Sequence, residues 1–437
     1  MDTPENAPVE GGQPLQSAFE NTSQYCIGIG GCGTHLVDSI LLRKAMDDSL
    51  TDQWNAIMSG EALLTSNINE VAESYYFSEV KNEPPRETAK EYVFTKDQQG
   101  AGLNWEIGNE GFNEHLDEYA TWNAAWGPDL HTEALEEAHS IWLLHSAGGG
   151  TGGGTTPALA NELSELLYNG PHANPTLLSF PVFAPQAGGG LEAHNSLKTL
   201  DHLRDTTQAI IPLSNDHLLA TEFDCQIENL GEWTPFTQEN KAIVRFLELL
   251  GAALTADWGV DDHPPGDTFD VNDVYHPLKQ FEPTDGEPKA PVLAPAIATS
   301  GEEPPAFGKQ SLDELLGRLL TEGSLIEFDP ATAINGTFVL CIPGDSPQEP
   351  FHTIHRDIEE IANAYLEFDH KWFSTQVYLL SMEGLDSIHL IGLFGYPELP
   401  LVAEFEDRAA QIADTSEFDA AYQSHREKLT DLLDKAG

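Results

Sequence analysis

Glycine-rich turns at two places in the chain could bind an anion. The segment Ser146–Gly154 reads S-A-G-G-G-T-G-G-G; it follows an apolar run at 141–144 and precedes an Ala/Leu-rich helical stretch that begins near Pro157. The segment Tyr25–Gly33 reads Y-C-I-G-I-G-G-C-G and precedes another helical pattern. Glycine lets backbone N–H groups converge on an anion, and a helix N-terminus adds favourable partial charge. One such stretch alone could be a flexible linker, but two strand–turn–helix units indicate that both hold one nucleotide.

The first turn also has the glycine spacing of a dinucleotide-binding dehydrogenase, at Gly28, Gly30 and Gly33. That pattern requires an acidic residue about 20 positions later, at the end of the second strand. The second apolar segment is expected at 54–58, and the acid that follows it, Glu61, comes late. The second glycine turn has no counterpart in a dehydrogenase, so this alternative is disfavoured.

In these turns the chain resembles the FtsZ/tubulin superfamily. The superfamily loop G-G-G-T-G-[ST]-G is similar to Gly148–Gly154, with Gly153 in place of the hydroxyl residue. The N-terminal loop G-I-G-G-x-G is similar to Gly28–Gly33. Gly100–Asn104, followed by Glu106–Gly108, resembles the third loop, which wraps the γ-phosphate side and senses that phosphate. The resemblance therefore implies that three loops surround the phosphates.

Further segments resemble the parts of that site that bind the base and the ribose. Ile210–Leu219 is similar to the strand and the Asn-Asp turn that lead towards the central helix. Phe236 and Asn240 have the family's spacing of four, which implies that the ring stacks on guanine and the amide binds its edge. His35 stands where the family has asparagine or glutamine near the base, and Glu192 is the implied ribose contact. The resemblance implies GTP or GDP with Mg²⁺ as the ligands. The implied nucleotide-binding residues are Gly28, Gly30, Gly31, Cys32, Gly33, His35, Gly100, Ala101, Gly102, Asn104, Gly148, Gly149, Gly150, Thr151, Gly152, Gly153, Glu192, Phe236 and Asn240.

The segment Thr268–Val274 reads T-F-D-V-N-D-V and resembles the synergy loop N-L-D-F-A-D-V, which one subunit inserts into the nucleotide site of the next. Asp270 and Asp273 stand at the two carboxylate positions that position and polarise the attacking water, so they are the predicted catalytic residues. The alternative is helix capping, because aspartate is favoured at helix starts for structural reasons alone. Thr268 replaces the family's asparagine, and Met58–Gly60, which we assign to the second loop, lacks the acid of the usual N-T-D.

The elements that must position these residues indicate an α/β protein. Residues 1–22 are acidic, rich in Pro and Gly, and expected to be disordered. Residues 23–235 alternate strand and helix patterns, which predicts a Rossmann-like GTPase domain with a parallel sheet covered on both faces. A long central helix and the synergy loop are expected at 236–275. An α/β domain with a mixed sheet is expected at 276–400, followed by a charged helical tail at 401–437.

Hydrophobic periodicity places the individual elements. The apolar positions of 240–258 have a helical period and predict the long core helix. A polar stretch at 65–135 is either a decoration that sets partner specificity or a set of long surface loops. The C-terminal elements expected are a strand at 292–298, a helix at 312–320, a strand at 336–342, a helix at 354–368, and strands at 376–381 and 387–394.

Acidic residues are spread over the whole chain, with 72 Asp+Glu against 20 Lys+Arg and a formal charge of −52. Self-repulsion on this scale destabilises a compact domain in dilute buffer, whereas at molar salt the Debye length falls to about 3 Å. We interpret the acidity as adaptation to the salt-rich cytoplasm of a halophilic archaeon, and it excludes nucleic acid as a partner. No apolar run approaches the length of about 18 residues that spans a bilayer. The N-terminus also lacks a basic-then-apolar signal. We therefore expect a cytoplasmic protein that is not inserted in a membrane.

The four cysteines show neither zinc spacing nor a disulfide-dense pattern. Cys32 is expected to line the first glycine turn, and Cys26, Cys225 and Cys341 to be buried reduced thiols. The 16 histidines form no ligand cluster, so no metal held by protein side chains is expected.

The resemblance implies a GTP-binding cytoskeletal protein that self-assembles head to tail and hydrolyses GTP at the subunit interface, in the service of cell division or cell shape. The missing acid at Met58–Gly60 and the exchange at Thr268 are the reasons to keep a second, less favoured alternative, a catalytically weak nucleotide-binding regulator of another FtsZ-like polymer. The expected partner is the chain itself, with other FtsZ-like proteins or a membrane anchor as further partners.

Overall fold

The structure, a computed structural model, describes residues 23–45, 54, 57–66, 89–94, 100–119, 135, 138–168, 175–183, 189–220, 237–255, 269–275, 278, 289–300, 308–344, 354–365, 374–382, 385 and 387–412. The segment expected to be disordered, 1–22, and the tail beyond residue 412 lie outside these ranges.

The N-terminal domain is built on a seven-stranded sheet in the order β3-β2-β1-β4-β5-β6, with β7 also paired to β5, and each pairing is parallel. Its strands are β1 (Gln24–Ile29), β2 (Met58–Thr65), β3 (Ala89–Val93), β4 (Ser140–Ser146), β5 (Thr176–Phe183), β6 (Ala209–Ile210) and β7 (Leu213–Ser214). Its helices are α1 (Gly30–Ala45), α4 (Trp105–Tyr119), α7 (Gly150–Tyr168), α8 (Gly190–Thr206) and α9 (Asn215–Ala220).

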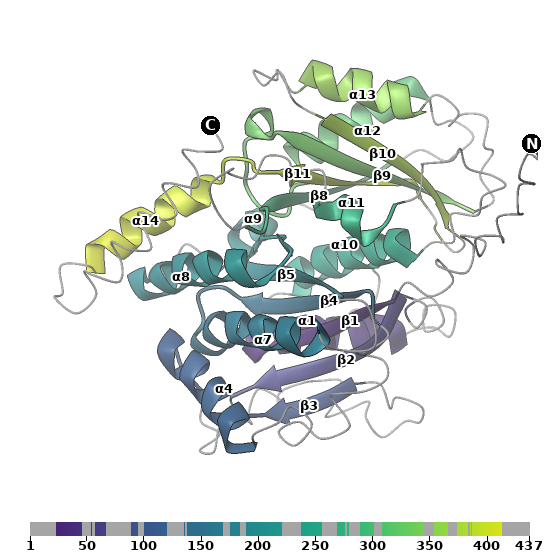
Figure 1. The fold of residues 1–437 in the computed structure, drawn as a ribbon. Coiled ribbons are helices and arrows are strands. Elements are labelled where there is room, and N and C mark those ends of the chain that lie inside the picture. Colours follow the sequence, from purple (N-terminus) through teal and green to yellow (C-terminus); the bar gives the residue numbers. More distant parts are fainter. Residues whose placement is uncertain are drawn as a thin grey trace, which may run out of the picture.

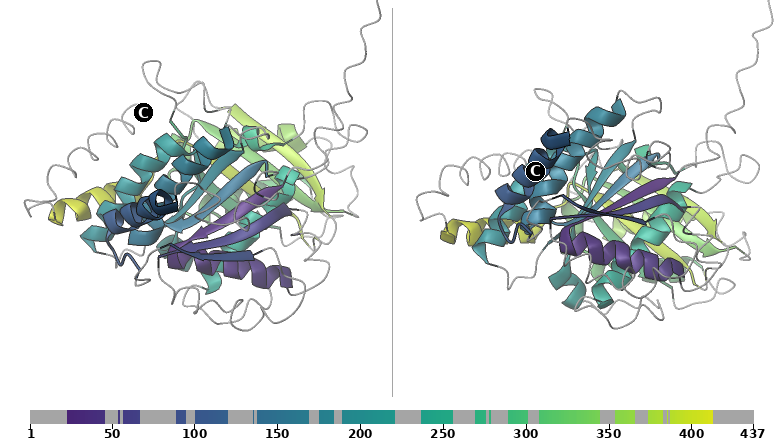
Figure 2. Two further views of the ribbon diagram at one scale, coloured as in Figure 1. Left: turned by 60° about the horizontal axis from the view of Figure 1, so that its bottom comes forward. Right: turned by 90° about the horizontal axis from the view of Figure 1, so that it is seen from below.

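Both faces of this sheet are covered, as its near-continuous apolar strands predict. On one face Cys26 of β1 and Trp142 of β4 pack with α1 and with the central helix α10 (Thr237–Thr255). On the other face the neighbouring residues Ile27 and Ile141 pack with Phe112 of α4 and with α7. The views in Figure 2 show α1 on one side of the strands and α4 with α7 on the other. The predicted parallel, doubly covered sheet is therefore confirmed.

The C-terminal domain has a four-stranded mixed sheet in the order β10-β9-β11-β8. Here β10 is parallel to β9, while β11 is antiparallel to both β9 and β8. Its elements are β8 (Leu293–Thr299), α12 (Lys309–Thr321), η5 (Pro330–Thr332), β9 (Asn335–Pro343), α13 (Ile354–Tyr365), β10 (Ser374–Met382), β11 (His389–Gly395) and α14 (Pro400–Ile412). They confirm the predicted order of strands and helices in this half, and α14 packs on α8.

The central helix α10 lies between the two sheets, as Figure 1 shows. Its residues Ile243 and Leu247 belong to one apolar core with Leu178 of the parallel sheet and with Val339 and Ile391 of the mixed sheet. The helical period predicted from the sequence is therefore confirmed, with α10 beginning three residues earlier than expected.

Two local predictions were wrong. The stretch 65–135 is more than decoration or loops, because it supplies β3, which pairs with β2, and α4, which packs on α7. The helix expected near Pro157 begins at Gly150 and runs through that proline. Its first turns are rich in glycine and threonine, which are poor helix formers, so their helical form depends on packing that no local signal announces. The strand expected within 210–219 is present as β6 and β7, and the Asn-Asp turn forms the first residues of α9.

Candidate nucleotide-binding site

The two glycine turns meet at the carboxyl edge of the parallel sheet. Ile29 at the end of β1 pairs with His145 near the end of β4, so both strands finish at the same level. Gly30 has a φ of +68°, a conformation that favours glycine. A Cβ atom on Gly30 would lie 3.0 Å from the amide nitrogen of Gly152 and 3.3 Å from the Cβ of Thr151. The first residue of α1 and the first turn of α7 are thus neighbours.

The first turn is closed too tightly for side chains at two positions. A Cβ on Gly33 would lie 2.2 Å from the carbonyl oxygen of Leu144, and one on Gly28 would lie 2.4 Å from the carbonyl oxygen of Gly33. Gly31 and Cys32 occupy the first turn of α1, where backbone N–H groups lack helical partners and attract anions. Burial raises the pKa of the Cys32 thiol to about 12. Cys32 therefore contributes a neutral thiol at this helix start.

The third loop lies directly on the second glycine turn. The amide of Gly150 donates to the carbonyl of Gly102 (3.0 Å). A Cβ on Gly150 would lie 2.4 Å from that same Gly102 oxygen. Gly100 donates its amide to the carbonyl of Ser66 (3.0 Å), and Ala101 is buried. The predicted loop 100–104 is thus in contact with both the β2 end and the α7 start.

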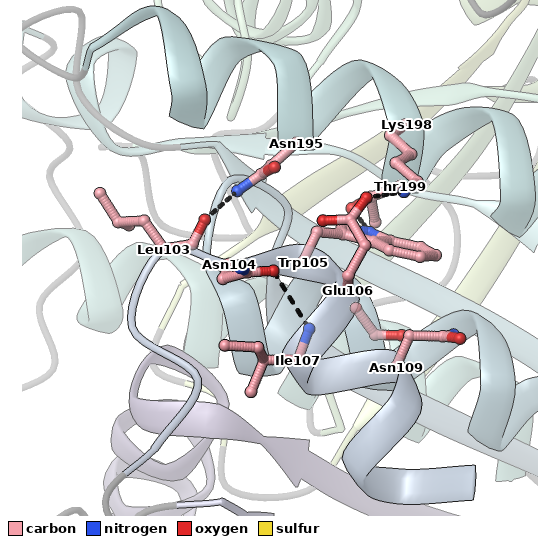
Figure 3. A network of polar contacts seen from close by, with 10 residues as sticks. Leu103, Asn104, Trp105, Glu106, Ile107, Asn109, Asn195, Lys198 and Thr199 are labelled. Atoms are coloured by element: carbon pink, nitrogen blue, oxygen red, sulfur yellow. Dashed lines mark hydrogen bonds and ion pairs between the residues drawn. The ribbon is translucent and has the colours of Figure 1, made fainter. Parts of the chain in front are cut away.

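Asn104, predicted to bind the nucleotide, caps helix α4. Its Oδ1 accepts the amide hydrogen of Ile107 at 3.1 Å, which is the bond of an N-cap residue, as Figure 3 shows. Leu103 and Ile107 on either side of it are 46% and 48% exposed, and such large apolar side chains are rarely so open among the described residues. The loop is therefore held by its backbone and presents two apolar side chains to solvent.

Helices α4 and α7 cross at a distance that only glycine permits. A Cβ on Gly108 would lie 2.1 Å from the Gly150 carbonyl oxygen, and one on Gly154 would lie 2.1 Å from the Trp105 carbonyl oxygen. Two side chains fasten the crossing. Thr155 Oγ1 donates to the Gly108 carbonyl (3.1 Å), and Asn109 Nδ2 donates to the Gly154 carbonyl (3.0 Å).

The crossing accounts for the helix that runs through Pro157. Packing against α4 fixes the first turns of α7, and Thr156 Oγ1 bonds the Gly152 carbonyl at 2.6 Å.

The glycine that replaces a hydroxyl residue at position 153 has a structural explanation. A Cβ there would lie 2.4 Å from the Ala147 carbonyl oxygen and 2.6 Å from Thr199 Oγ1 of α8. Thr199 donates to that Ala147 oxygen (2.9 Å) and accepts from the indole N–H of Trp105 (3.1 Å). A hydroxyl from α8 therefore occupies the space beside the turn, so the exchange to Gly153 fits its surroundings.

The prediction that Met58–Gly60 is the second loop was wrong. These residues are the first three of β2 and pair with Gln24 and Tyr25, at the amino end of the sheet. Because Glu61 is charged, the strand was predicted to end before it. In the structure Glu61 is buried and paired with Lys44 Nζ at 3.1 Å, so the strand continues through it.

The second loop begins instead after Thr65, at the carboxyl end of β2. Ser66 is its first residue, and its hydroxyl lies 2.6 Å from Thr151 Oγ1 of the second glycine turn. The sequence continues with Asn67, which lies outside the described residues. Ser66 was missed because the strand was predicted to end at Met58. A strand of 8 residues that begins at Met58 places Ser66 directly after it.

Glu192 and two residues predicted to bind the base, His35 and Asn240, lie on α8, α1 and α10. Glu192 stands in the first turn of α8, where its Oε2 accepts the amide hydrogen of Gly189. Its carbonyl oxygen lies 3.0 Å from where a Cβ on Gly148 would be. Asn240 at the start of α10 is buried and donates from Nδ2 to Ser39 Oγ of α1 at 3.3 Å. Ser39 in turn donates to the His35 carbonyl (2.8 Å), so Asn240 and His35 share a neighbour. Phe236 lies outside the described residues.

The polar groups of the loops suit a phosphate better than a metal ion. The described loops offer backbone amides and the hydroxyls of Ser66 and Thr151. In the described part of the chain, no group of three or more His, Cys, Asp and Glu could hold a metal. The described residues therefore do not form a Mg²⁺ site by themselves, and Mg²⁺ stays a prediction.

Asp270 and Asp273 form a capping box at the start of α11 (Val271–Tyr275). Asp270 Oδ1 accepts the amide hydrogen of Asn272 (2.6 Å), and Asp273 Oδ2 accepts the amide hydrogen of Asp270 (2.9 Å). Each bond uses one oxygen of its carboxylate. The helix-capping alternative is thus observed. Catalysis by the same two carboxylates stays a prediction.

Helix α10 packs beside α1 near its start, where Asn240 contacts Ser39, the tenth residue of α1. Its last turns reach the amino edge of the parallel sheet, because a Cβ on Gly251 would lie 2.4 Å from Cγ2 of Ile57, just before β2, and 3.3 Å from Trp142. Its 19 residues correspond to a length of roughly 28 Å. Figure 1 shows α11 beside α10, on the side of the mixed sheet.

The N-terminal part of the chain, which carries this site, matches a known protein family. Residues 24–222 match the family described as "Tubulin/FtsZ family, GTPase domain". No curated protein sequence matches the chain. None of the helices in the described residues has both the length and the apolar character needed to cross a bilayer.

Solved structures share the fold over most of the chain. CetZ2 from Haloferax volcanii, a GTPgS-bound protofilament, has a TM-score of 0.64 at 16% identity and covers 91% of this chain and 100% of its own. CetZ1 from Haloferax volcanii, a GDP-bound monomer, has a TM-score of 0.64 at 14% identity and covers 90% and 99%. An empty FtsZ dimer from M. jannaschii has a TM-score of 0.53 at 15% identity and covers 86% and 88%. At these identities the likeness establishes the fold.

Proposed function

Because residues 24–222 form a GTPase domain of the Tubulin/FtsZ family, we propose that the protein binds GTP, assembles head to tail and hydrolyses GTP where two subunits meet. The phosphates bind at the turns around Gly30 and Gly152, and the base lies beside Asn240 at the start of α10. Support for GTP binding comes from the meeting of two helix N-termini, which together supply amides and partial positive charge.

The placement of the two halves of the site is the observation that carries the proposal. Phe269, next to Asp270, packs on Tyr378 of the mixed sheet with ring centroids 4.9 Å apart, whereas the glycine turns lie at the carboxyl edge of the parallel sheet. We therefore assign the two carboxylates to the nucleotide site of a neighbouring subunit. Head-to-tail contact would bring α11 of one subunit to the glycine turns of the next. A heterologous contact of this kind repeats and forms a filament.

Hydrolysis in this arrangement depends on positioning and charge. Amides of the turns hold the transferred phosphoryl group, and the carboxylates of the neighbouring subunit orient the attacking water and accept its hydrogen bonds. Both solved neighbours named as assemblies, the CetZ2 protofilament with GTPgS and the FtsZ dimer, are consistent with self-association of this fold.

The test is GTP turnover measured against protein concentration in molar KCl. Turnover per subunit that rises with concentration, together with sedimentable filaments, is the expected result because a site is complete only between subunits. Turnover that is substantial in the dilute monomer and independent of concentration contradicts hydrolysis at an interface.

A catalytically weak nucleotide-binding regulator is the second candidate, and one observation favours it. Both carboxylates already have a structural partner, Asn272 N for Asp270 and Asp270 N for Asp273. In the sequence the four residues that follow β2, Ser66 to Asn69, include no acid, and Glu70 is the first acid after them. Tight GTP binding with flat, negligible turnover at every concentration identifies this candidate.

The cellular setting follows from composition and family together. The acidic surface fits a salt-rich cytoplasm, and division or cell shape is the process that such a polymer serves. Fluorescence localisation in dividing and elongating cells separates these two roles, and co-purification tests for a membrane anchor or another FtsZ-like partner.

A further inference from the structure

Asn195 of α8 joins two loops that are far apart in the sequence. Its Nδ2 atom lies 2.8 Å from the Leu103 carbonyl oxygen of the third loop and 3.1 Å from the Gly148 carbonyl oxygen of the second glycine turn. The side-chain amide has two N–H hydrogens, so it can donate to both carbonyls at once. Asn195 is buried, at 2% exposure, and Figure 3 shows its amide directed at Leu103.

The bond to Gly148 fixes the direction of the next amide. In a planar trans peptide the C=O and the N–H point in opposite directions. With the Gly148 carbonyl held by Asn195, the N–H of Gly149 points away from α8. An anion on that side of the turn would meet this N–H, so Asn195 orients a donor that it does not itself touch.

The bond to Leu103 adds a side-chain contact to a loop that is otherwise held by its backbone. The Leu103 side chain is 46% exposed, so it adds little packing of its own. The neighbouring backbone bond from Gly150 to Gly102 (3.0 Å) belongs to the same contact between loop and turn. A shift of the third loop therefore pulls on the Asn195 amide and through it on the Gly148 peptide.

A second contact of α8 lies one helical turn further along, on the same face. Thr199 accepts from the Trp105 indole and donates to the Ala147 carbonyl, the residue before Gly148. Lys198 lies 3.8 Å from the centre of the Trp105 ring and pairs with Glu106, as Figure 3 shows. The same helix face thus fastens both the third loop with α4 and the second turn.

We propose that Asn195 is a positioning residue that couples the third loop to the phosphate-binding turn, so that the protein distinguishes GTP from GDP. This rests on the proposed function, because it assumes a guanine nucleotide whose γ-phosphate lies on the third-loop side. With a γ-phosphate bound, the third loop stays closed and Asn195 keeps the Gly148 peptide aligned. Without it, the loop relaxes and the alignment is lost.

Asn195→Ala tests the coupling, because it removes both bonds without adding charge near the phosphates. The measurement is the ratio of the dissociation constants for GDP and for GTPγS, by calorimetry in molar KCl. Loss of coupling should reduce the wild-type ratio at least about fivefold, the lower end of typical coupling between sites, with the GTPγS affinity falling more than the GDP affinity. Asn113→Ala is the matched control, since Asn113 lies on the exposed face of α4 and its amide bonds Asn109 within the same helix.

A folded Asn195→Ala protein with the wild-type ratio overturns the proposal, and so does a wild type that binds GDP and GTPγS equally well. A wild type that binds no guanine nucleotide refutes the proposed function itself. If the variant does not fold, hydrogen exchange on the wild type decides. When GDP is replaced by GTPγS, amides of 100–104 and 147–152 should gain protection together, and a change confined to one segment overturns the coupling.

Discussion

The hydroxyl oxygens of Ser66 and Thr151 lie 2.6 Å apart, so the end of β2 is hydrogen-bonded to the first turn of α7. Through this contact the second loop becomes part of the candidate site. The apolar pattern of the sequence did not predict that position.

Ser66→Ala should weaken GTP binding, because it removes a hydrogen bond that holds Thr151 at the phosphate turn. The expected loss is about 0.5 to 1.5 kcal/mol, measured by calorimetry. Ser59→Ala is the matched control, since Ser59 lies at the other end of the same strand and donates to the Gln24 carbonyl at 3.2 Å. Equal losses in the two variants would contradict the position assigned to the second loop.

Asn240→Ala should cost about 1 to 3 kcal/mol of GTP affinity, because a site that pairs polar groups loses these bonds when one partner is removed. Wild type should bind GTP well ahead of ATP. Ser39→Ala separates base recognition from packing, since Ser39 is the observed partner of Asn240. If Ser39→Ala lowers GTP affinity as much as Asn240→Ala, or if ATP and GTP bind equally, the base assignment is refuted.

Asp270→Ala tests catalysis against capping. Loss of the cap should lower stability by about 1 kcal/mol, and loss of a catalytic carboxylate should lower turnover by at least about tenfold. Asp329→Ala is the matched control, because Asp329 Oδ1 accepts from Ala331 N two residues on (3.0 Å), in the same geometry as the bond from Asn272 to Asp270. The control should lose similar stability while keeping its turnover.

Mixed polymers extend the same test. Carboxylates that act on the neighbouring subunit predict that Asp270→Ala subunits depress wild-type turnover beyond simple dilution. The Asp270→Ala, Asp273→Ala double variant should form long-lived filaments because GTP persists. Normal turnover in that double variant at filament-forming concentration would sink the mechanism.

Sequence reasoning predicted the parallel sheet, the central helix and the mixed C-terminal sheet because long apolar periods and glycine turns are local signals. It failed at Glu61, where a buried ion pair with Lys44 lets an acid continue a strand. It also failed at Pro157, where packing on α4 sustains a helix against local preference. Asn195 and Thr199 were missed because they donate hydrogen bonds to backbone carbonyls of segments far away in the sequence. A pattern of side-chain types does not reveal such partners.

Salt should stabilise the fold strongly. With a formal charge of −52, repulsion is screened only when the Debye length is short. We expect a cooperative circular-dichroism melt above about 1 M KCl and loss of cooperative structure well below that. A melt in low salt that equals the one in molar KCl would show that the acidity has another origin.

Acid should destabilise the fold through His389. Arg245 has only donors, so its Nη2 donates to His389 Nε2 (3.0 Å) and the ring proton sits on Nδ1, facing Thr299 Oγ1 at 2.9 Å. Burial, and then the charge of Arg245, lowers the pKa of His389 from 6.5 to about 3. The unfolded chain therefore binds a proton in this window that the folded chain does not, so stability is complete above pH 6.5 and is lost as pH falls towards 3.

Denaturant unfolding at pH 7.5 and pH 5 checks this titration. Wild type should lose up to about 1.4 kcal/mol per pH unit from this one group, and His389→Gln should lose correspondingly less. Burial also lowers the pKa of His145 to about 4, so part of the acid sensitivity remains in the variant. Identical pH slopes for the two proteins would mean that His389 does not titrate on unfolding.

The crossing of α4 and α7 has a genetic consequence. At Gly108, Gly150 and Gly154 a Cβ would come within 2.1 to 2.4 Å of a carbonyl oxygen in the other segment. Every missense change of a glycine codon adds a Cβ, so no substitution at these three positions is conservative. In a library of single substitutions their only tolerated variants should be synonymous ones. The closest approach of the two helices is therefore also a place where the gene should tolerate no missense change.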